Sequence, residues 1–323
     1  MPRRAGAVSV AELADMPLPS FDPTSPPWPG HTESVAGASV FVRRTPSTSA
    51  HAEPAVYVHG LAGSSTNWTD LATLLAPWLD ATALDLPGFG RSGPAPGSDY
   101  SIAGAARVLI GHIEQRDRGP VHLVGNSMGG AVSITVAAAR PDLVRTLTLI
   151  SPAVPDLRLG RPDADPLMAL LLVPGPASTL VERRLAMLSP RERVVRTLRL
   201  CFADPARIPP SRLEQAIEEL TARRGQPWTT TAFSRSLRGI VRHWLAVGPM
   251  SAWRELTKIS APSLVVWGDR DKLVDVRLAP RVARAIPDCR LLVLNGVGHT
   301  AQMEEPRLTA RAVLSLLNAT GAP

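Results

Sequence analysis

Cysteine is scarce in this sequence: the 323 residues contain two, Cys201 and Cys289, which lie far apart in the chain. Neither has another cysteine or a histidine at metal-ligand spacing, so the sequence predicts no zinc site and no disulfide framework. We therefore expect no metal and no cofactor. A reducing compartment such as the cytoplasm fits this use of cysteine.

Long apolar runs are also missing. The longest, Leu167–Pro176, is about half the ~20 residues that a membrane-spanning helix needs. The N-terminus begins with basic residues, but Glu12 and Asp15 interrupt the following segment before an apolar stretch forms, so no signal peptide is predicted. We expect a soluble, cytoplasmic protein without stable membrane insertion.

A third absence concerns charge: no basic run is interleaved with aromatic residues. The net charge of +7 and the isoelectric point near 10.5 raise nucleic acid and acidic membrane surfaces as partners. However, the arginines are spread along the chain with acidic residues between them, as a genome that encodes arginine in place of lysine would also produce. Nucleic-acid binding is therefore not expected.

What the sequence does contain is enough apolar residues for a full core, 45% in total. Short segments of strand composition alternate with helical segments, which predicts an α/β fold with a mostly parallel sheet and helices on both faces. A hairpin is expected at the sheet edge over Val35–Arg44. The further predicted strands are Ala55–Val58, Thr82–Asp85, one that begins at Val121, Leu143–Ile150, Ser263–Trp267 and Arg290–Leu294.

Strand alternation stops after Pro152 and resumes at Ser263. This interruption predicts a helical cap over residues 155–254, inserted above the carboxyl ends of the strands of a core made of residues 31–154 and 255–323. Residues 1–30 are interpreted as an N-terminal extension that wraps the surface or is partly disordered, with order beginning near His31. The predicted cap helices are Leu180–Leu188, Arg191–Phe202, Ser211–Arg224 and Thr231–Val247.

Ser127 stands between glycines at a predicted junction of strand and helix. A serine at the tip of so sharp a turn has a strained backbone, and the residues two positions away on either side pack too closely for a Cβ atom. Gly125 and Gly129 have none. The pattern G-x-S-x-G between a strand and a helix is typical of a nucleophile elbow. Ser127 is therefore the candidate nucleophile.

A serine hydroxyl needs a base to take its proton. In proteins with this elbow the acid and then the histidine follow the serine in the chain, and two histidines follow Ser127, His243 and His299. His243 falls within a predicted cap helix, whereas His299 lies in a glycine-rich loop directly after the last predicted strand. We assign His299 as the base.

The acid that orients this imidazole is expected after the penultimate strand, where Asp269, Asp271 and, a little later, Asp275 are candidates. Position alone does not separate these three carboxylates. A carboxylate in such a loop also serves as a turn cap or as the partner of a neighbouring arginine.

Backbone N–H groups are the usual donors to the oxyanion that forms during acyl transfer. The residue after the nucleophile supplies the N–H of Met128, and the loop after Ala55–Val58 supplies a second, that of Leu61. His59 precedes the serine in the chain and is interpreted as a residue that orients this loop.

With these residues assembled, the sequence resembles the α/β-hydrolase superfamily, specifically its cap-bearing serine hydrolases. The resemblance implies the α/β-hydrolase fold, and in that family the acid stands last in G-x-x-D, which assigns the role to Asp271 and leaves Asp269 structural. A serine nucleophile argues against relatives that use aspartate, the epoxide hydrolases and haloalkane dehalogenases. The matches, in order over about residues 31–318, are His59-Gly60-Leu61, Asp85–Ser92, Gly125–Gly130, Gly268–Asp271, and Gly298-His299 with Glu304.

Two branches of the superfamily compete. Asn126, together with Ala301-Gln302 and Glu304, resembles the meta-cleavage-product hydrolases, which break a C–C bond. Leu61-Ala62-Gly63 and Thr300 depart from the pattern of that group, and its substrate-binding cap arginine is not matched. Carboxylesterases and lipases share the remaining motifs, so the resemblance favours a small apolar ester or acyl substrate.

Two other activities stay open, because one fold supports many functions. A member of the fold can bind a ligand without catalysis, although all three triad positions are filled here, and a perhydrolase or acyltransferase would use the same triad with another acceptor. We expect a serine esterase in which Ser127, His299 and Asp271 form the triad and the N–H groups of Leu61 and Met128 form the oxyanion hole.

Overall fold

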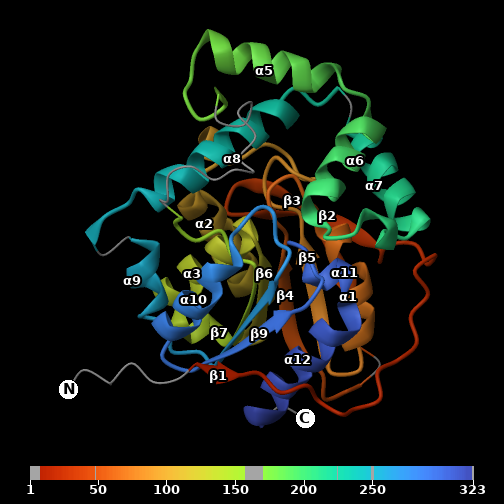
Figure 1. The fold of residues 1–323 in the computed structure, drawn as a ribbon, viewed down its shortest axis with the longest axis vertical. Coiled ribbons are helices and arrows are strands. Elements are labelled where there is room, and N and C mark those ends of the chain that lie inside the picture. Colours follow the sequence, from red (N-terminus) through yellow and green to blue (C-terminus); the bar gives the residue numbers. More distant parts are fainter. Residues whose placement is uncertain (1–7, 48, 157–169, 224, 249–250, 322–323) are drawn as a thin grey trace.

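The computed structural model describes residues 8–47, 49–156, 170–223, 225–248 and 251–321. Within these residues one nine-stranded sheet has the order β1-β9-β8-β7-β6-β4-β5-β3-β2 (Figure 1). β3 runs antiparallel to both of its neighbours, and the other described pairings are parallel. The strands are β1 (Ser9–Val10), β2 (Gly30–Val35), β3 (Ala38–Thr45), β4 (Glu53–Val58), β5 (Leu79–Leu84), β6 (Val121–Asn126), β7 (Val144–Ile150), β8 (Ser263–Gly268) and β9 (Cys289–Leu294).

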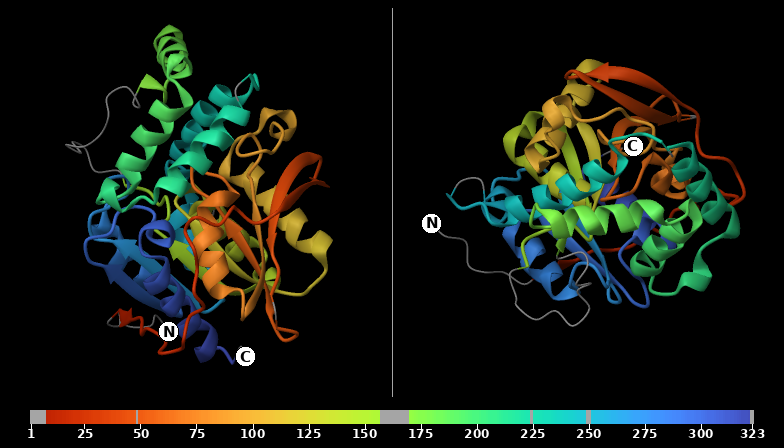
Figure 2. Two further views of the ribbon diagram at one scale, coloured as in Figure 1. Left: turned by 90° about the vertical axis from the view of Figure 1, so that its right-hand side faces the viewer. Right: turned by 90° about the horizontal axis from the view of Figure 1, so that it is seen from above.

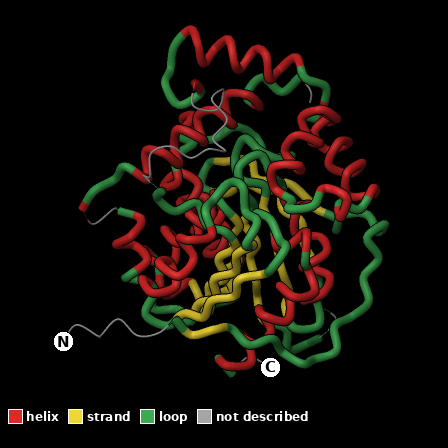
Figure 3. The backbone as a smooth tube through the Cα atoms, viewed as in Figure 1, coloured by secondary structure: helices red, strands yellow, loops and turns green. Residues whose placement is uncertain are grey.

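Helices cover both faces of this sheet (Figure 3). On one face α2 (Ile102–Arg116), α3 (Met128–Ala139) and α10 (Ala279–Ala285) contribute to one buried apolar cluster. On the other face α1 (Thr69–Leu75) and α12 (Pro306–Ala319) contribute to a second. β6 and β8 are therefore buried along their whole length, as parallel strands between two helical layers must be. The predicted architecture of the core is confirmed.

The predicted hairpin at the sheet edge is confirmed, and its first strand begins earlier than expected, at Gly30. Val35 pairs with Ala38, so the turn consists of two residues. These are Ala36 and Gly37, with φ angles of 47° and 78°. Two positive φ values give the turn a twist that matches the twist of the paired strands.

The expectation that order begins near His31 is wrong. Ser9 and Val10 form β1, which pairs in parallel with β9 at the edge of the sheet opposite the hairpin. Ala14 is buried, and the indole Nε1 of Trp28 donates to Thr73 Oγ1 at 3.1 Å. From residue 8 onward the extension therefore wraps the surface, as one of the two alternatives held. Ala11 and Ala14 belong to the buried cluster that includes α1 and α12, and Met16, Leu18 and Phe21 pack against it.

The segment between β7 and β8 contains only helices among its described residues, and it forms the cap at the top of Figure 1. The four predicted cap helices are present, each with ends that differ by a few residues. Two short helices, α9 (Ala252–Leu256) and α11 (Ala301–Glu304), were not predicted, because four or five residues carry little periodicity. The cap segment contains α5 (Pro176–Met187), α6 (Pro190–Cys201), α7 (Pro210–Ala222), α8 (Thr229–Trp244) and α9 (Ala252–Leu256).

The apolar run Leu167–Pro176 begins outside the described residues. Of its described part, Leu171 is buried and Val173 is 71% exposed. No helix within the described residues is both long and apolar enough to cross a bilayer. Single 3₁₀ turns connect the larger elements at η1 (Ser65–Trp68), η2 (Pro96–Ser98), η3 (Pro141–Leu143), η4 (Pro205–Arg207) and η6 (Val276–Leu278).

Candidate active site

Ser127 occupies the single-residue turn between β6 and α3, with φ 53° and ψ −117°. This backbone conformation is unfavourable for a residue with a Cβ, so the surroundings must enforce it. A Cβ on Gly125 would lie 2.5 Å from Ser133 Oγ, and a Cβ on Gly129 would lie 2.5 Å from the carbonyl oxygen of His59. The two glycines are therefore required by space, as the sequence pattern predicted.

Backbone hydrogen bonds hold the strained turn in place. The N–H of Ser127 donates to the carbonyl of Ile150 at 3.0 Å, at the end of the neighbouring strand β7. The carbonyl of Ser127 accepts from Ala131 at 3.0 Å and from Ala153 at 2.9 Å. The side chain is partly exposed, so Ser127 is fixed in position and remains accessible to a small molecule.

The structure brings His299 and Asp271 together. Nδ1 of His299 lies 2.8 Å from Oδ2 of Asp271, whose side chain is fully buried. Oδ1 of the same carboxylate accepts the N–H groups of Leu273 at 2.8 Å and Val274 at 2.9 Å. Burial by itself would raise the pKa of Asp271, but the nearby His299 charge and these hydrogen bonds outweigh it and lower the pKa. The carboxylate is therefore ionised and aimed at the imidazole.

The other candidates for the acid and the base have different partners. Oδ1 of Asp269 accepts the N–H of Gly296 at 2.7 Å, which joins two loops. Oδ1 of Asp275 accepts the N–H of Arg277 at the start of η6. His243, on α8, faces Glu255 at 3.6 Å, and burial lowers its pKa. The hydrogen bond of Asp269 and the ion pair of His243 therefore lead to partners other than His299 and Asp271.

Asn126 connects the serine turn to the histidine loop. Its Nδ2 donates to the carbonyl of Ile150 at 3.0 Å and to the carbonyl of His299 at 3.1 Å. The side chain is buried, and its amide gives the carbonyl of Ile150 a second donor beside the N–H of Ser127 and gives the carbonyl of His299 a donor as well. Sequence reasoning used Asn126 only as a family match and missed this role, because its partner lies 173 residues further along the chain.

The loop after β4 packs directly against the serine. A Cβ on Gly60 would lie 3.0 Å from Ser127 Cβ, so this loop approaches the elbow as closely as a glycine permits. The N–H groups of Leu61 and Met128 have no intramolecular acceptor among the described residues. Both therefore remain available to a bound group.

His59 holds this loop with both of its ring nitrogens. The backbone N–H of Leu86 donates to Nε2 at 2.9 Å, so Nδ1 carries the hydrogen and donates to the carbonyl of Gly60 at 2.7 Å. The ring is fully buried beside the edge of Phe89, and burial lowers its pKa to about 4. A neutral His59 thus bridges the loops after β4 and β5, which agrees with the loop-orienting role inferred from the sequence.

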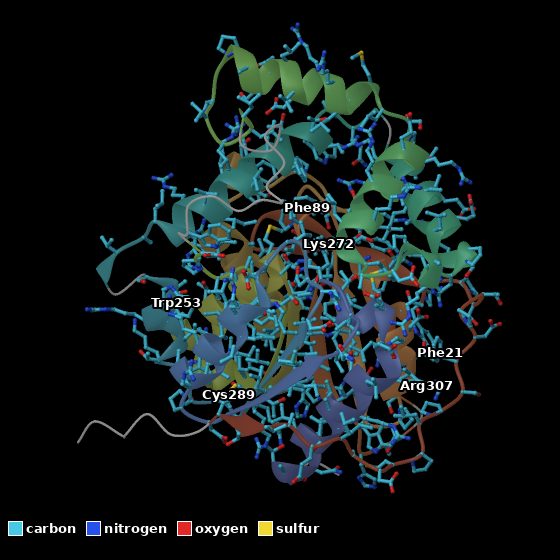
Figure 4. All side chains as sticks on the ribbon, viewed as in Figure 1. Phe21, Phe89, Trp253, Lys272, Cys289 and Arg307 are labelled. Atoms are coloured by element: carbon cyan, nitrogen blue, oxygen red, sulfur yellow. The ribbon has the colours of Figure 1, made fainter. Side chains whose placement is uncertain are left out.

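The cap helix α7 contacts the same two loops through buried polar side chains. Ser64 Oγ donates to Glu219 Oε2 at 2.6 Å, and Thr66 Oγ1 donates to the same oxygen at 3.0 Å. Arg223, just after α7, donates to the carbonyl of Gly88 at 2.7 Å. These hydrogen bonds therefore connect the cap to the loops after β4 and β5. Figure 4 places Phe89 and Lys272 at this upper end of the core, beneath the cap helices.

A small cavity, partly open to solvent, lies between core and cap and reaches Met128, the residue after the serine. Its walls come from the loop after β5, from α2 and from α8 of the cap. Most of the lining side chains are apolar, and Ser236 is the contribution of the cap. The apolar lining side chains include Leu86, Phe89, Ile102, Val108 and Met128.

The sequence pattern of the alpha/beta hydrolase fold family matches residues 54–306. The chain is 27% identical over 275 residues to 2-hydroxy-6-oxononadienedioate/2-hydroxy-6-oxononatrienedioate hydrolase of Cupriavidus pinatubonensis, across 84% of this chain and 88% of that protein. It is 26% identical over 269 residues to monoacylglycerol lipase ABHD6 of Homo sapiens, across 83% and 76%. A solved membrane phospholipase A shares the fold, with a TM-score of 0.71 at 23% identity over 91% of this chain and 87% of that chain. The chain belongs to the α/β-hydrolase family.

Proposed function

We propose that the protein is a serine hydrolase that cleaves carboxylic esters through Ser127, His299 and Asp271. The observation that carries the proposal is the 2.8 Å contact between His299 Nδ1 and the buried carboxylate of Asp271. An ionised carboxylate only accepts hydrogen bonds, so Nδ1 must carry the hydrogen of the neutral imidazole. Nε2 is then the basic nitrogen.

In the first half of the proposed reaction, His299 Nε2 takes the proton of Ser127 Oγ while Oγ attacks the ester carbonyl. The resulting oxyanion accepts hydrogen bonds from the free N–H groups of Leu61 and Met128. The imidazolium is stabilised by Asp271 and returns its proton to the leaving alcohol as the C–O bond breaks. An acyl-enzyme remains on Ser127.

In the second half, Nε2 takes a proton from water, and the hydroxyl attacks the acyl carbonyl. The same two N–H groups hold the second oxyanion. Collapse of this intermediate releases the carboxylic acid, and the proton returns to Ser127 Oγ. The triad is restored, and no cofactor takes part in the proposed cycle.

The cavity beside Met128 supports an apolar acyl or alcohol group. Its apolar walls would remove a hydrocarbon chain from water next to the reacting carbonyl, which favours binding in proportion to the area buried. The human relative is named a monoacylglycerol lipase, and lipid esters carry such chains.

A C–C bond hydrolase is the second candidate, because the bacterial relative is named for the hydrolysis of a dienedioate. A substrate that carries carboxylates requires a cation. Arg193 on cap helix α6 is partly buried, which lowers its pKa, and it has no acidic partner in the described structure. Turnover of a ring-fission dienoate with loss of turnover in Arg193→Gln would favour this reaction.

The proposed esterase is tested with p-nitrophenyl esters from acetyl to dodecanoyl, compared between wild type, Ser127→Ala and the exposed control Ser20→Ala. We expect turnover in wild type and control and a loss of at least about 10⁴-fold in Ser127→Ala. The preferred length of the acyl chain would indicate how long a chain the cavity accommodates. Turnover that survives Ser127→Ala would refute the mechanism, and inactivity at every length would shift the choice to the C–C hydrolase or to a non-catalytic protein.

A further inference from the structure

The excess of positive charge is confined to the cap segment, even though arginines occur throughout the chain. Residues 155–254 contain 16 arginines and 9 acidic residues, a net charge of +7. The rest of the chain contains 19 basic and 19 acidic residues and is neutral. Of the described residues of this segment, 13 are arginine and 7 are acidic. Most of them belong to α5–α8, which lie over the carboxyl ends of the strands (Figure 1).

Within the cap, α5 lies farthest from the sheet and projects from the tip of the molecule (Figures 1 and 2). Leu180, Arg183, Arg184 and Met187 are all exposed and lie at spacings of three, four and seven residues, so they share one face of the helix. Leu180 is 59% exposed and Met187 is 78% exposed. Val173, which precedes the helix, is 71% exposed. We call these five residues the α5 face.

We propose that the α5 face docks on an anionic lipid surface. Leu180, Met187 and Val173 would leave water for the boundary between headgroups and acyl chains, while the guanidinium groups of Arg183 and Arg184 would stay at the level of the phosphates. The positive charge of the whole cap adds attraction toward a negatively charged leaflet. The inner side of α5 is already occupied, since Ser178 and Val181 are buried.

A lipid surface fits these residues better than a nucleic acid or an acidic protein. A nucleic acid uses the arginines but gains nothing from Leu180 and Met187. A protein partner would need a groove that encloses a projecting helix and places acids beside both arginines. A lipid surface accepts a projecting helix without a preformed groove and offers phosphates and acyl chains together. The inference rests on the proposed function in one respect, since an apolar ester would be supplied from such a surface.

Docking is measured by flotation of the full chain with vesicles of phosphatidylcholine, with and without about 30% phosphatidylglycerol, at low and physiological salt. The variants are Leu180→Ser/Met187→Ser and Arg183→Gln/Arg184→Gln. Neither pair touches the ion pair between Glu182 and Arg238 that holds α5 to α8. The matched control is Val10→Ser/Arg284→Gln, which changes one exposed apolar and one exposed basic residue on the core.

We expect at least tenfold tighter binding to the anionic vesicles, a tenfold or greater loss in each α5 variant, and no loss in the control. Equal binding to both vesicles, loss in the control, or full binding by Leu180→Ser/Met187→Ser would overturn the proposal. The same variants are assayed on soluble p-nitrophenyl acetate, where we expect wild-type rates. Absence of all esterase activity with intact vesicle binding would refute the proposed function alone, and the reverse result would refute docking alone.

Discussion

The backbone N–H of His299 donates to the carbonyl oxygen of Cys201, 2.6 Å away, so the histidine loop is bonded to the last residue of cap helix α6. Gly298 makes this approach possible, because a Cβ there would lie 2.5 Å from Ala203 N. The position of the proposed base is therefore tied to the position of the cap. A change that displaces the end of α6 should also displace His299.

The carboxylate of Glu304 reinforces this junction. It accepts the N–H of Gly298 at 2.7 Å on the histidine side, and the N–H groups of Ala203 at 3.1 Å and Asp204 at 3.3 Å on the cap side. Lys272, next to Asp271, adds a hydrogen bond from Nζ to Phe202 O at 3.1 Å. Two residues that adjoin the proposed triad thus hold the end of the same cap helix.

Glu304→Gln should lower both activity and stability. An amide presents an NH₂ group to N–H donors, so we expect a loss of about 2–4 kcal/mol in the free energy of unfolding from the broken charge-assisted hydrogen bonds. Displacement of His299 should lower kcat about 10–100-fold with a smaller change in KM. Ester kinetics and urea denaturation measure the two effects.

The control for Glu304→Gln is its neighbour Glu305→Gln. Glu305 pairs with Arg207 on the partly exposed surface, so its loss should cost less than about 1 kcal/mol and leave kcat within twofold. Equal kcat for both variants would mean that Glu304 supports the fold without positioning His299. Because Asp is one methylene shorter, Glu304→Asp should not restore the full rate.

Asp271→Asn should be far more damaging than Asp269→Asn. With an amide at position 271, Nδ1 of His299 loses its anionic acceptor and the wrong tautomer is favoured, which lowers kcat about 10⁴-fold in the serine proteases. Asp269 accepts the N–H of Gly296, so its amide variant should remain within about tenfold of wild type. Steady-state ester kinetics, with circular dichroism to show that both variants are folded, decides the point. Equal losses in folded variants would leave the choice of Asp271 unsupported.

His299→Ala should abolish ester hydrolysis, with a fall in kcat of about 10⁴-fold or more. By contrast, His243→Ala should keep kcat within about threefold, because His243 faces Glu255 on the cap side and no triad residue. The comparison uses the same p-nitrophenyl ester for both variants. Residual activity of His299→Ala at the level of His243→Ala would exclude His299 as the base.

His59 should make stability depend on pH. Burial lowers its pKa from the ordinary value of 6.5 to about 4. Between pH 4 and pH 6.5 this histidine is therefore protonated in the unfolded chain and neutral in the folded chain. Stability is therefore full above pH 6.5 and falls as the pH drops toward 4, by about 3 kcal/mol for this residue. Urea denaturation of wild type and His59→Gln from pH 4 to 7.5 measures it.

The difference in stability between wild type and His59→Gln should narrow as the pH falls, since the variant lacks the titrating group. His122→Gln is a useful comparison, because burial lowers the pKa of His122 as well while Glu53 opposes the shift through a hydrogen bond. The difference in stability between wild type and His122→Gln should therefore change less with pH. A gap between wild type and His59→Gln that stays constant with pH would show that His59 does not resist protonation.

Much of the fold could be predicted because it depends on residues that are close together in the sequence. The alternation of strand and helix segments is set by periodicity, and in the two-residue turn Gly37 accepts a positive φ without steric cost. The short strand β1 could not be predicted from two residues, Ser9 and Val10. It exists because β9 offers an open edge with which they pair.

The sequence by itself determined the candidate nucleophile. Gly125, Ser127 and Gly129 lie within five residues, and the turn has no room for a Cβ at either glycine position, so the spacing alone predicts the turn. Chain order left His243 and His299 as the candidate base, and the glycine-rich loop after the last predicted strand selected His299. The choice of Asp271, however, came from a family resemblance, since Asp269 and Asp275 satisfy the same spacing rules.

Only the tertiary structure decided which side chains meet. It directs Asp271 to His299, turns Asp269 toward Gly296, and gives Asn126 and Glu304 their contacts with the histidine loop. The physical reason is that each of these contacts joins loops or helices whose relative position is set by packing of the sheet and the cap. Residue type states what a side chain can bind, and the fold decides what lies within its reach.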